Sequence, residues 1–538
     1  MSHTHTHRWY FLFPFVVISA LLCMSCTPRP TNAGKPAPKD TGPKRVTESP
    51  VDQQKDAKKA QSRNDKVVIT GDLNSVDWNS HVGKQIVIKG DLMIIDTYDL
   101  ARRGQIKVAR NRLPVPTGRI DPNDADPREN SIQGGSNVAK VTAAQKRNDG
   151  ASITIDDSTA DQNVFPLSLF PELGKTYPTI RIGSIVHGVS GRLIKERNKL
   201  VIQSNQPLQW TPAKRPERPD LGKPDITVAS FNVLNYFTTI DDGKNKARGA
   251  DSDSELSRQE EKITAAIEGL QADVIGLMEL ENNIDAEQRL VAALNRKVGK
   301  NLYKGCGIPK GFDESPGGDD SIRVGIIYRA DRVSPVGEVS IVDDEAFSIA
   351  RTPVVQTFVS TQGGRPFTVI VNHFKSKGGA SNADTANKDK GDGQAAYNAA
   401  RRAQSLAICD YIKQNHQDTE QSRVLVIGDL NAYQQEDPID ALRANGLIDL
   451  HEQLGQSTPT DSRDVDYTFV YYAQSGSLDH AFATKSLAED VTGVSIWHIN
   501  ADEPRFMDYN QEYNPESVYS ADAYRSSDHD PVLIGLKK

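Results

Sequence analysis

The chain has 538 residues, of which 37% are hydrophobic and 25% charged, so it is long enough for more than one domain and apolar enough to bury a sizeable core. The formal net charge is −7, but residues 27–66 carry 10 basic and 5 acidic side chains, and residues 67–538 carry a net charge of −13. This balance excludes a nucleic-acid binder of the generally basic kind, so any attraction to phosphate requires a local group of cations or a metal ion.

The first residues have the layout of an export signal. Arg8 precedes an apolar run over residues 9–22, which is shorter than the roughly 20 residues that span a bilayer. The run leads to Ser25-Cys26, which resembles a bacterial lipobox, although Cys23 stands where leucine is usual. We expect residues 1–26 to be a signal peptide and the protein to be an outer-membrane or cell-surface lipoprotein, held in the membrane by a lipid on Cys26. Secretion without a lipid and an uncleaved anchor are the alternatives.

The segment after the signal is rich in Pro, Lys, Asp, Gln and Thr and nearly lacks large apolar side chains. We therefore expect residues 27–65 to be a disordered tether. Residues 66–212 change to a β-rich pattern that favours a small OB-like barrel, interrupted by a mobile polar insertion over residues 111–150. Its short apolar runs are bounded by Gly and Asp and lie at residues 66–70, 85–89, 105–108, 151–155, 182–190 and 199–202. Substrate binding and a spacer role are equally open for this domain.

A Pro- and charge-rich linker over residues 213–224 precedes the second folded part, residues 225–538. Here apolar strands alternate with helical patterns, one over residues 257–270 and one over residues 394–414. The expected strands lie at residues 226–231, 274–277, 324–328, 367–371, 424–427 and 531–534. Strands this apolar are covered on one or both faces, so the pattern predicts an α/β sandwich. The two cysteines in these residues, Cys306 and Cys409, could form one disulfide or remain two buried thiols.

Polar side chains recur at the ends of these strands. Each follows or precedes an apolar run directly, and the set comprises Asn232, Glu279, Asn372, His373, Asp429, Asn431, Asp528 and His529. A single Asp or Asn after a strand is usually a turn or a helix cap. Repetition at successive strands instead predicts that carboxylates, amides and imidazoles meet at one edge of a sheet.

In this order the motifs resemble those of the endonuclease/exonuclease/phosphatase superfamily, and most closely its bacterial extracellular nuclease branch, which is related to DNase I. The motifs are Ser230–Phe237, Leu277–Asn283, Asn372–Gly379, Gly428–Tyr433, Leu478–Phe482 and Ser527–Pro531. The resemblance covers residues 225–538 and implies a four-layered α/β sandwich of the DNase I-like type. That branch often carries an OB-like module before the catalytic domain.

The resemblance also implies roles for individual residues. Glu279 would be the main metal ligand, with Asn232 and Asp528 beside it. His529 would be the general base, oriented by Asp479, and His373 would donate a hydrogen bond or a proton near the phosphate. Asp429 and Asn431 would position the nucleophile and stabilise the transition state. The implied metal is Mg²⁺, with Mn²⁺ or Ca²⁺ as alternatives, because hard oxygen ligands suit these ions.

Other charged residues have competing interpretations. Arg351 could contact the substrate phosphate or form a structural ion pair. Lys375 and Lys377, with Arg401 and Arg402, could supply the local basic patch, although a solvated helix face explains the two arginines equally well. By side-chain alternation Glu281 is a surface neighbour of Glu279, and His480 is a packed neighbour of Asp479.

Taken together, the sequence predicts an extracellular, metal-dependent endonuclease that hydrolyses phosphodiester bonds in DNA, with RNA as a further substrate left open. No protein partner is implied. A phospholipid- or phosphoinositide-directed phosphodiesterase or phosphatase of the same superfamily is the main alternative. A non-enzymatic surface module is the second, and the complete set of expected catalytic residues argues against it.

Overall fold

The computed structural model describes residues 66–123, 136–196, 198–416, 421–452 and 466–538, which belong to one compact unit. The expected signal peptide, Cys26 and the tether lie outside the described residues. In the described ranges, no helix is long and apolar enough to cross a membrane.

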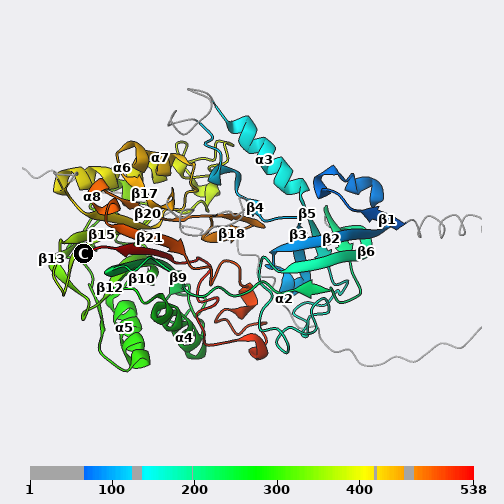
Figure 1. The fold of residues 1–538 in the computed structure, drawn as a ribbon, viewed down its shortest axis with the longest axis horizontal. Coiled ribbons are helices and arrows are strands. Elements are labelled where there is room, and N and C mark those ends of the chain that lie inside the picture. Colours follow the sequence, from blue (N-terminus) through cyan, green and yellow to red (C-terminus); the bar gives the residue numbers. More distant parts are fainter. Residues whose placement is uncertain (1–65, 124–135, 197, 417–420, 453–465) are drawn as a thin grey trace, which may run out of the picture. The chain divides into compact units, whose positions relative to one another are not determined.

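The N-terminal part contains a seven-stranded sheet that closes on itself (Figure 1). β2 pairs with β3 on one side and with β6 on the other, and β5 and β7 complete the ring between them. The inward side chains, such as Ile86, Ile106 and Ile155, form one apolar core. The strands are β1 (Lys66–Ile69), β2 (Gln85–Asp96), β3 (Gln105–Ala109), β5 (Ser152–Asp156), β6 (Ile185–Glu196), β7 (Lys199–Gln203) and β8 (Trp210–Thr211).

The expected mobile insertion contains regular structure, so that expectation is wrong for its second half. Residues Val138–Gly150 form helix α3, drawn in cyan in Figure 1. Only Val141 of this helix is buried, and the Asn148 side chain donates hydrogen bonds of 2.7 Å to the Pro114 carbonyl and to Gln474. Contacts with distant segments therefore hold α3 in place, and its own sequence shows little amphipathic pattern.

Two six-stranded sheets make up the second part. The first has the order β11 (Tyr303–Gly305), β12 (Ile322–Arg329), β10 (Val274–Glu281), β9 (Ile226–Tyr236), β22 (Val532–Leu536) and β21 (Val491–Ile496). The second has the order β13 (Val333–Ile341), β14 (Val354–Ser360), β15 (Phe367–His373), β16 (Val424–Asp429), β20 (Asp479–Ala483) and β17 (Ile448–Asp449). Every strand that the sequence predicted here is present.

The two sheets face each other across a shared apolar core that includes Val228, Val369 and Ile427. Helices cover the outer faces (Figure 1). α4 (Asp253–Leu270) and α5 (Ile284–Val298) pack on the first sheet, and α6 (Asn398–Asn415) and α7 (Asp437–Ala444) pack on the second. The fold is thus mixed α/β, with few helices relative to strands.

A small three-stranded sheet joins the two parts of the chain. β18 (Phe469–Tyr471) pairs with β19 (Gln474–Gly476), and β19 pairs with β4 (Leu113–Pro114) from the N-terminal part. The remaining short helices are α2 (Leu100–Arg103), α8 (Lys485–Ala488) and the 3₁₀ turns Leu73–Ser75, Trp78–His81, Pro116–Gly118, Glu345–Phe347, Ala380–Asn382, Arg505–Met507 and Glu516–Val518.

Cys306 and Cys409 are both free, which answers the question that the sequence left open. Cys306 packs against the core between the sheets, whereas Cys409 lies in the core under α6. Burial raises the pKa of both thiols.

Candidate active site

Five of the eight polar residues predicted from the strand ends, Glu279, His373, Asp429, Asn431 and His529, line one cleft of about 770 Å³. Asn232, Asn372 and Asp528 do not line it, and the buried Asn372 side chain donates to the Ile370 and Ile427 carbonyls. β9, β10, β15, β16 and β20 run so that their functional side chains meet at the same edge of the two sheets. The charged, amide and imidazole residues that line the cleft are Gln145, Asn235, Arg248, Glu279, Arg351, His373, Lys377, Asp429, Asn431, Gln474 and His529.

A histidine and an aspartate at this cleft form a short hydrogen bond. His529 Nδ1 lies 2.7 Å from Asp479 Oδ2, and Asp479 in turn accepts a 2.6 Å hydrogen bond from the Thr468 hydroxyl. The Phe469 ring stacks on the imidazole at a centroid distance of 4.6 Å. With Nδ1 engaged and the ring fixed from one side, Nε2 is the nitrogen left to act on a substrate.

Asp429 lies between the two histidines of the cleft. Its Oδ2 is 3.4 Å from His373 Nε2 and 3.9 Å from His529 Nε2. Its Oδ1 accepts a 2.9 Å hydrogen bond from the Asn431 backbone amide, and the Asn431 side chain donates to the Phe374 carbonyl at 3.3 Å. Parallel pairing of β15 with β16 brings His373 opposite Asp429, so the sheet itself sets this geometry.

Glu279 sits at an irregularity in β10. The register with both neighbouring strands shifts around this residue, and its φ is +67°, a backbone conformation that costs a non-glycine residue free energy. Its two oxygens accept hydrogen bonds from the Asn232 side chain at 3.1 Å and from the Asn235 amide at 2.9 Å. Strain of this kind concentrates where a side chain must be aimed at a site.

Burial and the charges of neighbouring groups shift the pKa values of these side chains. Burial, and then the charge of Asp528, raise the pKa of Glu279, and burial raises the pKa of Asp429 to about 7. Burial alone would lower the pKa of His529, but Asp479 and Asp429 raise it well above its usual value. Burial, with Arg351 nearby, depresses the pKa of His373 far enough to keep that ring neutral.

These residues suit a divalent cation. Four carboxylates lie close together here: Glu279, Asp429, Asp479 and Asp528. A hard cation stabilises such an excess of negative charge. Ligand atoms of Asp429, Asp479 and His529 all lie within 4.8 Å of one another. Of these, Asp479 and His529 are already hydrogen-bonded to each other, whereas the Glu279 oxygens accept hydrogen bonds from neutral amide groups and no charged donor.

Not every predicted site residue has the predicted surroundings. The Asn232 carboxamide oxygen accepts from the Leu234 amide, so its nitrogen, not its oxygen, faces Glu279. Asp528 is half-buried and does not line the cleft, and the Ser527 hydroxyl lies 3.5 Å from its carboxylate. Lys375 does not line the cleft, because its ammonium group lies over the Tyr397 ring at 4.8 Å.

Arg351 lines the cleft and also approaches Asp320 at 3.5 Å, so both interpretations of this residue have a contact to support them.

The competing interpretations of the other charged residues are largely resolved. Glu281 accepts hydrogen bonds from Thr238 and Thr239 and does not line the cleft, and the buried His480 ring bonds to the Ala432 carbonyl. Lys377 pairs with Glu436 at 2.5 Å, and Arg401 is buried against backbone carbonyls. These last two cations therefore anchor the loop beside the cleft and do not form an open basic patch.

Thr468, Asn235 and Arg248 belong to the site but were missed in the sequence. Thr468 lies 11 residues before Asp479, and Arg248 lies in a polar loop with no periodic pattern. A residue that contributes a backbone amide, as Asn235 does, leaves no signal in its side-chain type. Only the fold brings these groups to the cleft.

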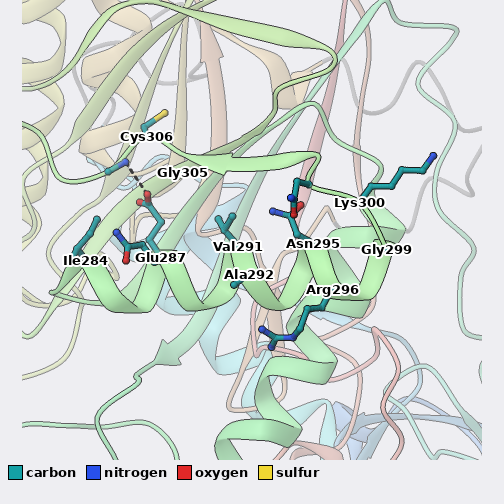
Figure 2. Close-up of a pocket in the computed structure, with 13 residues that line it drawn as sticks. Ile284, Glu287, Val291, Ala292, Asn295, Arg296, Gly299, Lys300, Gly305 and Cys306 are labelled. Atoms are coloured by element: carbon teal, nitrogen blue, oxygen red, sulfur yellow. Dashed lines mark hydrogen bonds between the residues drawn. The ribbon is translucent and has the colours of Figure 1, made fainter.

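A separate hollow of about 740 Å³, away from this cleft, runs along α5 (Figure 2). Glu287, which points into it, accepts a 2.8 Å hydrogen bond from the Gly307 amide and lies 3.4 Å from Arg323. Its acidic group is thus already paired within the protein. None of the predicted catalytic residues lines this hollow, which leaves the first cleft as the candidate active site.

Comparison with known proteins agrees with this geometry. Residues 229–529 match the model of the Endonuclease/Exonuclease/phosphatase family. Solved structures similar to the chain include a family protein from Bacteroides thetaiotaomicron, at 17% identity and a TM-score of 0.37 over 58% of this chain and 97% of the other. The human Nocturnin catalytic domain matches at 17% identity and a TM-score of 0.36 over 59% and 94% of the two chains.

A third similar structure is D. rerio TDP2 complexed with single-strand DNA product, at 16% identity and a TM-score of 0.36 over 57% and 97% of the two chains. A comparison with curated proteins found no match. The family match spans more than half of the chain and includes Glu279, His373, Asp429, Asp479 and His529. The chain therefore belongs to the Endonuclease/Exonuclease/phosphatase family, whose enzymes hydrolyse phosphodiester or phosphate ester bonds and generally depend on divalent metal ions.

Proposed function

We propose that the protein is an extracellular, metal-dependent endonuclease that hydrolyses phosphodiester bonds in DNA, on a DNase I-like catalytic domain preceded by an OB-like barrel. The observation that carries the proposal is the His529–Asp479 pair, 2.7 Å apart, beside Asp429 and Glu279 in an open cleft. An imidazole held by a carboxylate is the arrangement that activates water for attack on phosphorus.

In the proposed reaction, His529 in its neutral form accepts at Nε2 a proton from a water molecule as the water oxygen forms a bond to phosphorus. Because Asp479 and Asp429 raise the pKa of His529, the step requires this deprotonated form. The bond from phosphorus to the leaving oxygen breaks, that oxygen takes up a proton from a solvent water molecule, and the His529 imidazolium then returns its proton to solvent. Asp479 stabilises the imidazolium that forms, and Asp429 and Asn431 hold the attacking water. The neutral His373 ring donates a hydrogen bond on the opposite side, where charge develops on the phosphoryl group.

Glu279 would hold the divalent ion, which we propose to be Mg²⁺, with Asn232 orienting its carboxylate through the 3.1 Å hydrogen bond and Asp528 adding negative charge nearby. A bound Mg²⁺ supplies positive charge that stabilises the phosphoryl oxygens in the transition state. Arg351 and Arg248 add fixed cations along the same cleft. This local positive charge offsets the overall acidity of the chain.

We propose further that the protein is exported and anchored through Cys26, where it would digest DNA outside the cell. RNA remains a second candidate substrate. Charged side chains and apolar ones such as Phe469 and Leu478 both line the cleft, so a phospholipid-directed activity is the alternative that the experiment must separate from DNA cleavage.

The test is digestion of supercoiled plasmid, RNA and sphingomyelin vesicles by the purified protein, with Mg²⁺ or with EDTA. We expect metal-dependent plasmid nicking, and a loss of about 10²–10⁴-fold in the His529→Ala variant, the range of a general base. His187→Ala is the matched control, because His187 also bonds an aspartate, Asp91 at 2.9 Å, but lies outside the cleft. Lipid cleavage with intact plasmid would replace the proposal by the phospholipid-directed alternative.

A further inference from the structure

The β18–β19 hairpin places two exposed tyrosines at the mouth of the catalytic cleft. Its two-residue turn consists of Tyr472 and Ala473, whose φ angles are +46° and +68°. Turns of this kind favour Asn-Gly, because both positions have positive φ. A tyrosine here is strained, and 71% of its surface is exposed, so packing does not explain its presence.

Aromatic rings connect this turn to the catalytic imidazole. Phe469 stacks on His529, and Tyr471 stacks on Phe469 with a centroid distance of 6.3 Å and an interplanar angle of 17°. Tyr472 meets Tyr471 edge-on at 4.4 Å. The rings thus form a continuous path from the reacting centre to the surface.

The path leads into a second cleft of about 340 Å³, which Tyr471 and Tyr472 also line. Its other lining residues come largely from the N-terminal part: Lys107 on β3, Lys199 on β7, and Tyr98, which is 66% exposed, in the turn after β2. The Arg505 guanidinium donates a 3.2 Å hydrogen bond to the Tyr98 hydroxyl at its edge.

The charge of this second cleft favours an anionic ligand. Four cations line it, and one of its three acidic residues, Glu503, is already bound by Arg215 at 3.0 Å. Asp96 lies 3.9 Å from Lys107, so this acidic group is paired with one of the four cations, and Lys199, Arg505 and Arg525 remain. A cavity of this volume admits a splayed base or a small molecule but not a double helix.

We propose that this second cleft binds the single-stranded segment of a polynucleotide as it leaves the catalytic cleft. Bases would stack on Tyr472 and Tyr98, and Lys199 and Arg505 would contact the backbone phosphates. Aromatic platforms next to cations are how proteins hold single strands without sequence preference. The inference rests on the proposed nuclease function and assigns the N-terminal sheet a part in substrate binding.

The experiment measures fluorescence anisotropy of labelled dT4 and dT12 with the full protein in EDTA, which prevents cleavage. The wild type should bind dT12 at least tenfold more tightly than dT4, because only the longer strand reaches the second cleft. The Tyr98→Ala/Tyr472→Ala variant should lose most of this advantage, since one stacking ring is worth about a fivefold to a hundredfold change in affinity. Tyr513→Ala, which removes a tyrosine 76% exposed outside both clefts, should keep the advantage.

Equal affinity of the wild type for dT4 and dT12, or an advantage unchanged in the double variant, would overturn the proposal. So would a blunt duplex that competes as well as dT12 and loses affinity in the same variant, because that would make the surface a duplex site. Cleavage of both oligonucleotides with Mg²⁺ tests the nuclease function separately. If neither were cleaved while the dT12 advantage persisted, the nuclease proposal would fail and the binding site would stand.

Discussion

At the scale of single residues, Thr468 is the least conspicuous member of the candidate site. Its hydroxyl donates to Asp479 Oδ2 at 2.6 Å and accepts from the Asp479 amide at 3.2 Å. It therefore fixes the carboxylate that orients His529. Since Thr468 touches neither the substrate position nor the metal ligands, it is a positioning residue.

Thr468→Val should lower kcat about tenfold and leave KM nearly unchanged, because a hydrogen bond to a charged group is worth about 1.5–3 kcal/mol and here acts only through Asp479. Thr468→Ser keeps the hydroxyl and should restore most of the rate. Steady-state kinetics of plasmid nicking measure both. A serine variant as slow as the valine variant would show that the methyl group, not the hydroxyl, matters.

At the scale of elements, the N-terminal part is tied to the catalytic sheets by one buried network. Arg112, just before β4, donates two hydrogen bonds of 3.0 and 3.1 Å to Asp502, and its guanidinium lies over the Tyr467 ring at 4.1 Å. Asp502 also accepts from Arg181 and from the Tyr467 hydroxyl. These positive partners hold the pKa of Asp502 below its usual value despite burial.

Asp502→Asn should lower the free energy of unfolding by about 3–5 kcal/mol, because it leaves the buried Arg112 without its counter-charge and Arg181 with Glu503 alone, at 3.6 Å. Arg112→Met should cost less, since Arg181 still pairs with Asp502. Asp331→Asn is the control, because its ion pair with Arg329 is exposed and should be worth less than about 1 kcal/mol. Urea denaturation gives all three values, and equal losses for Asp502 and Asp331 would contradict the expectation.

At the scale of the whole molecule, a buried lysine makes stability depend on pH. Lys262 is 2% exposed and donates a 2.8 Å hydrogen bond to the Tyr524 carbonyl. Burial lowers its pKa to about 8 in the folded state, while an unfolded lysine titrates near 10.4. Between these values the unfolded chain binds more protons, so this residue makes the fold more stable as pH rises.

The free energy of unfolding of the wild type, relative to Lys262→Met, should therefore increase between pH 8 and pH 10 by up to about 1.4 kcal/mol per pH unit. Thermal or urea unfolding at a series of pH values measures this difference. Lys246→Met, which removes an exposed lysine, should show no such trend. Parallel curves for the wild type and Lys262→Met would refute the prediction.

Much of the fold and of the candidate site could be read from local sequence. The strands β9, β10, β15 and β16 appear as apolar runs, and α4 appears as a helical spacing of apolar residues, because these patterns arise within a few neighbouring residues. Glu279, His373, Asp429 and His529 were found in the same way, as polar residues at the ends of such strands.

Only the tertiary structure decided what depends on contacts between distant residues. It made α3 a helix, turned Lys375 onto Tyr397 and Lys377 onto Glu436, and brought Thr468 to Asp479. It also placed Tyr98 and Tyr472, separated by more than 370 residues, on one cleft. The sequence determined which chemical groups the protein has and which elements carry them. Tertiary packing decided which of these groups lie next to each other. The contacts that bring them together are between residues far apart in the sequence, which no local pattern relates.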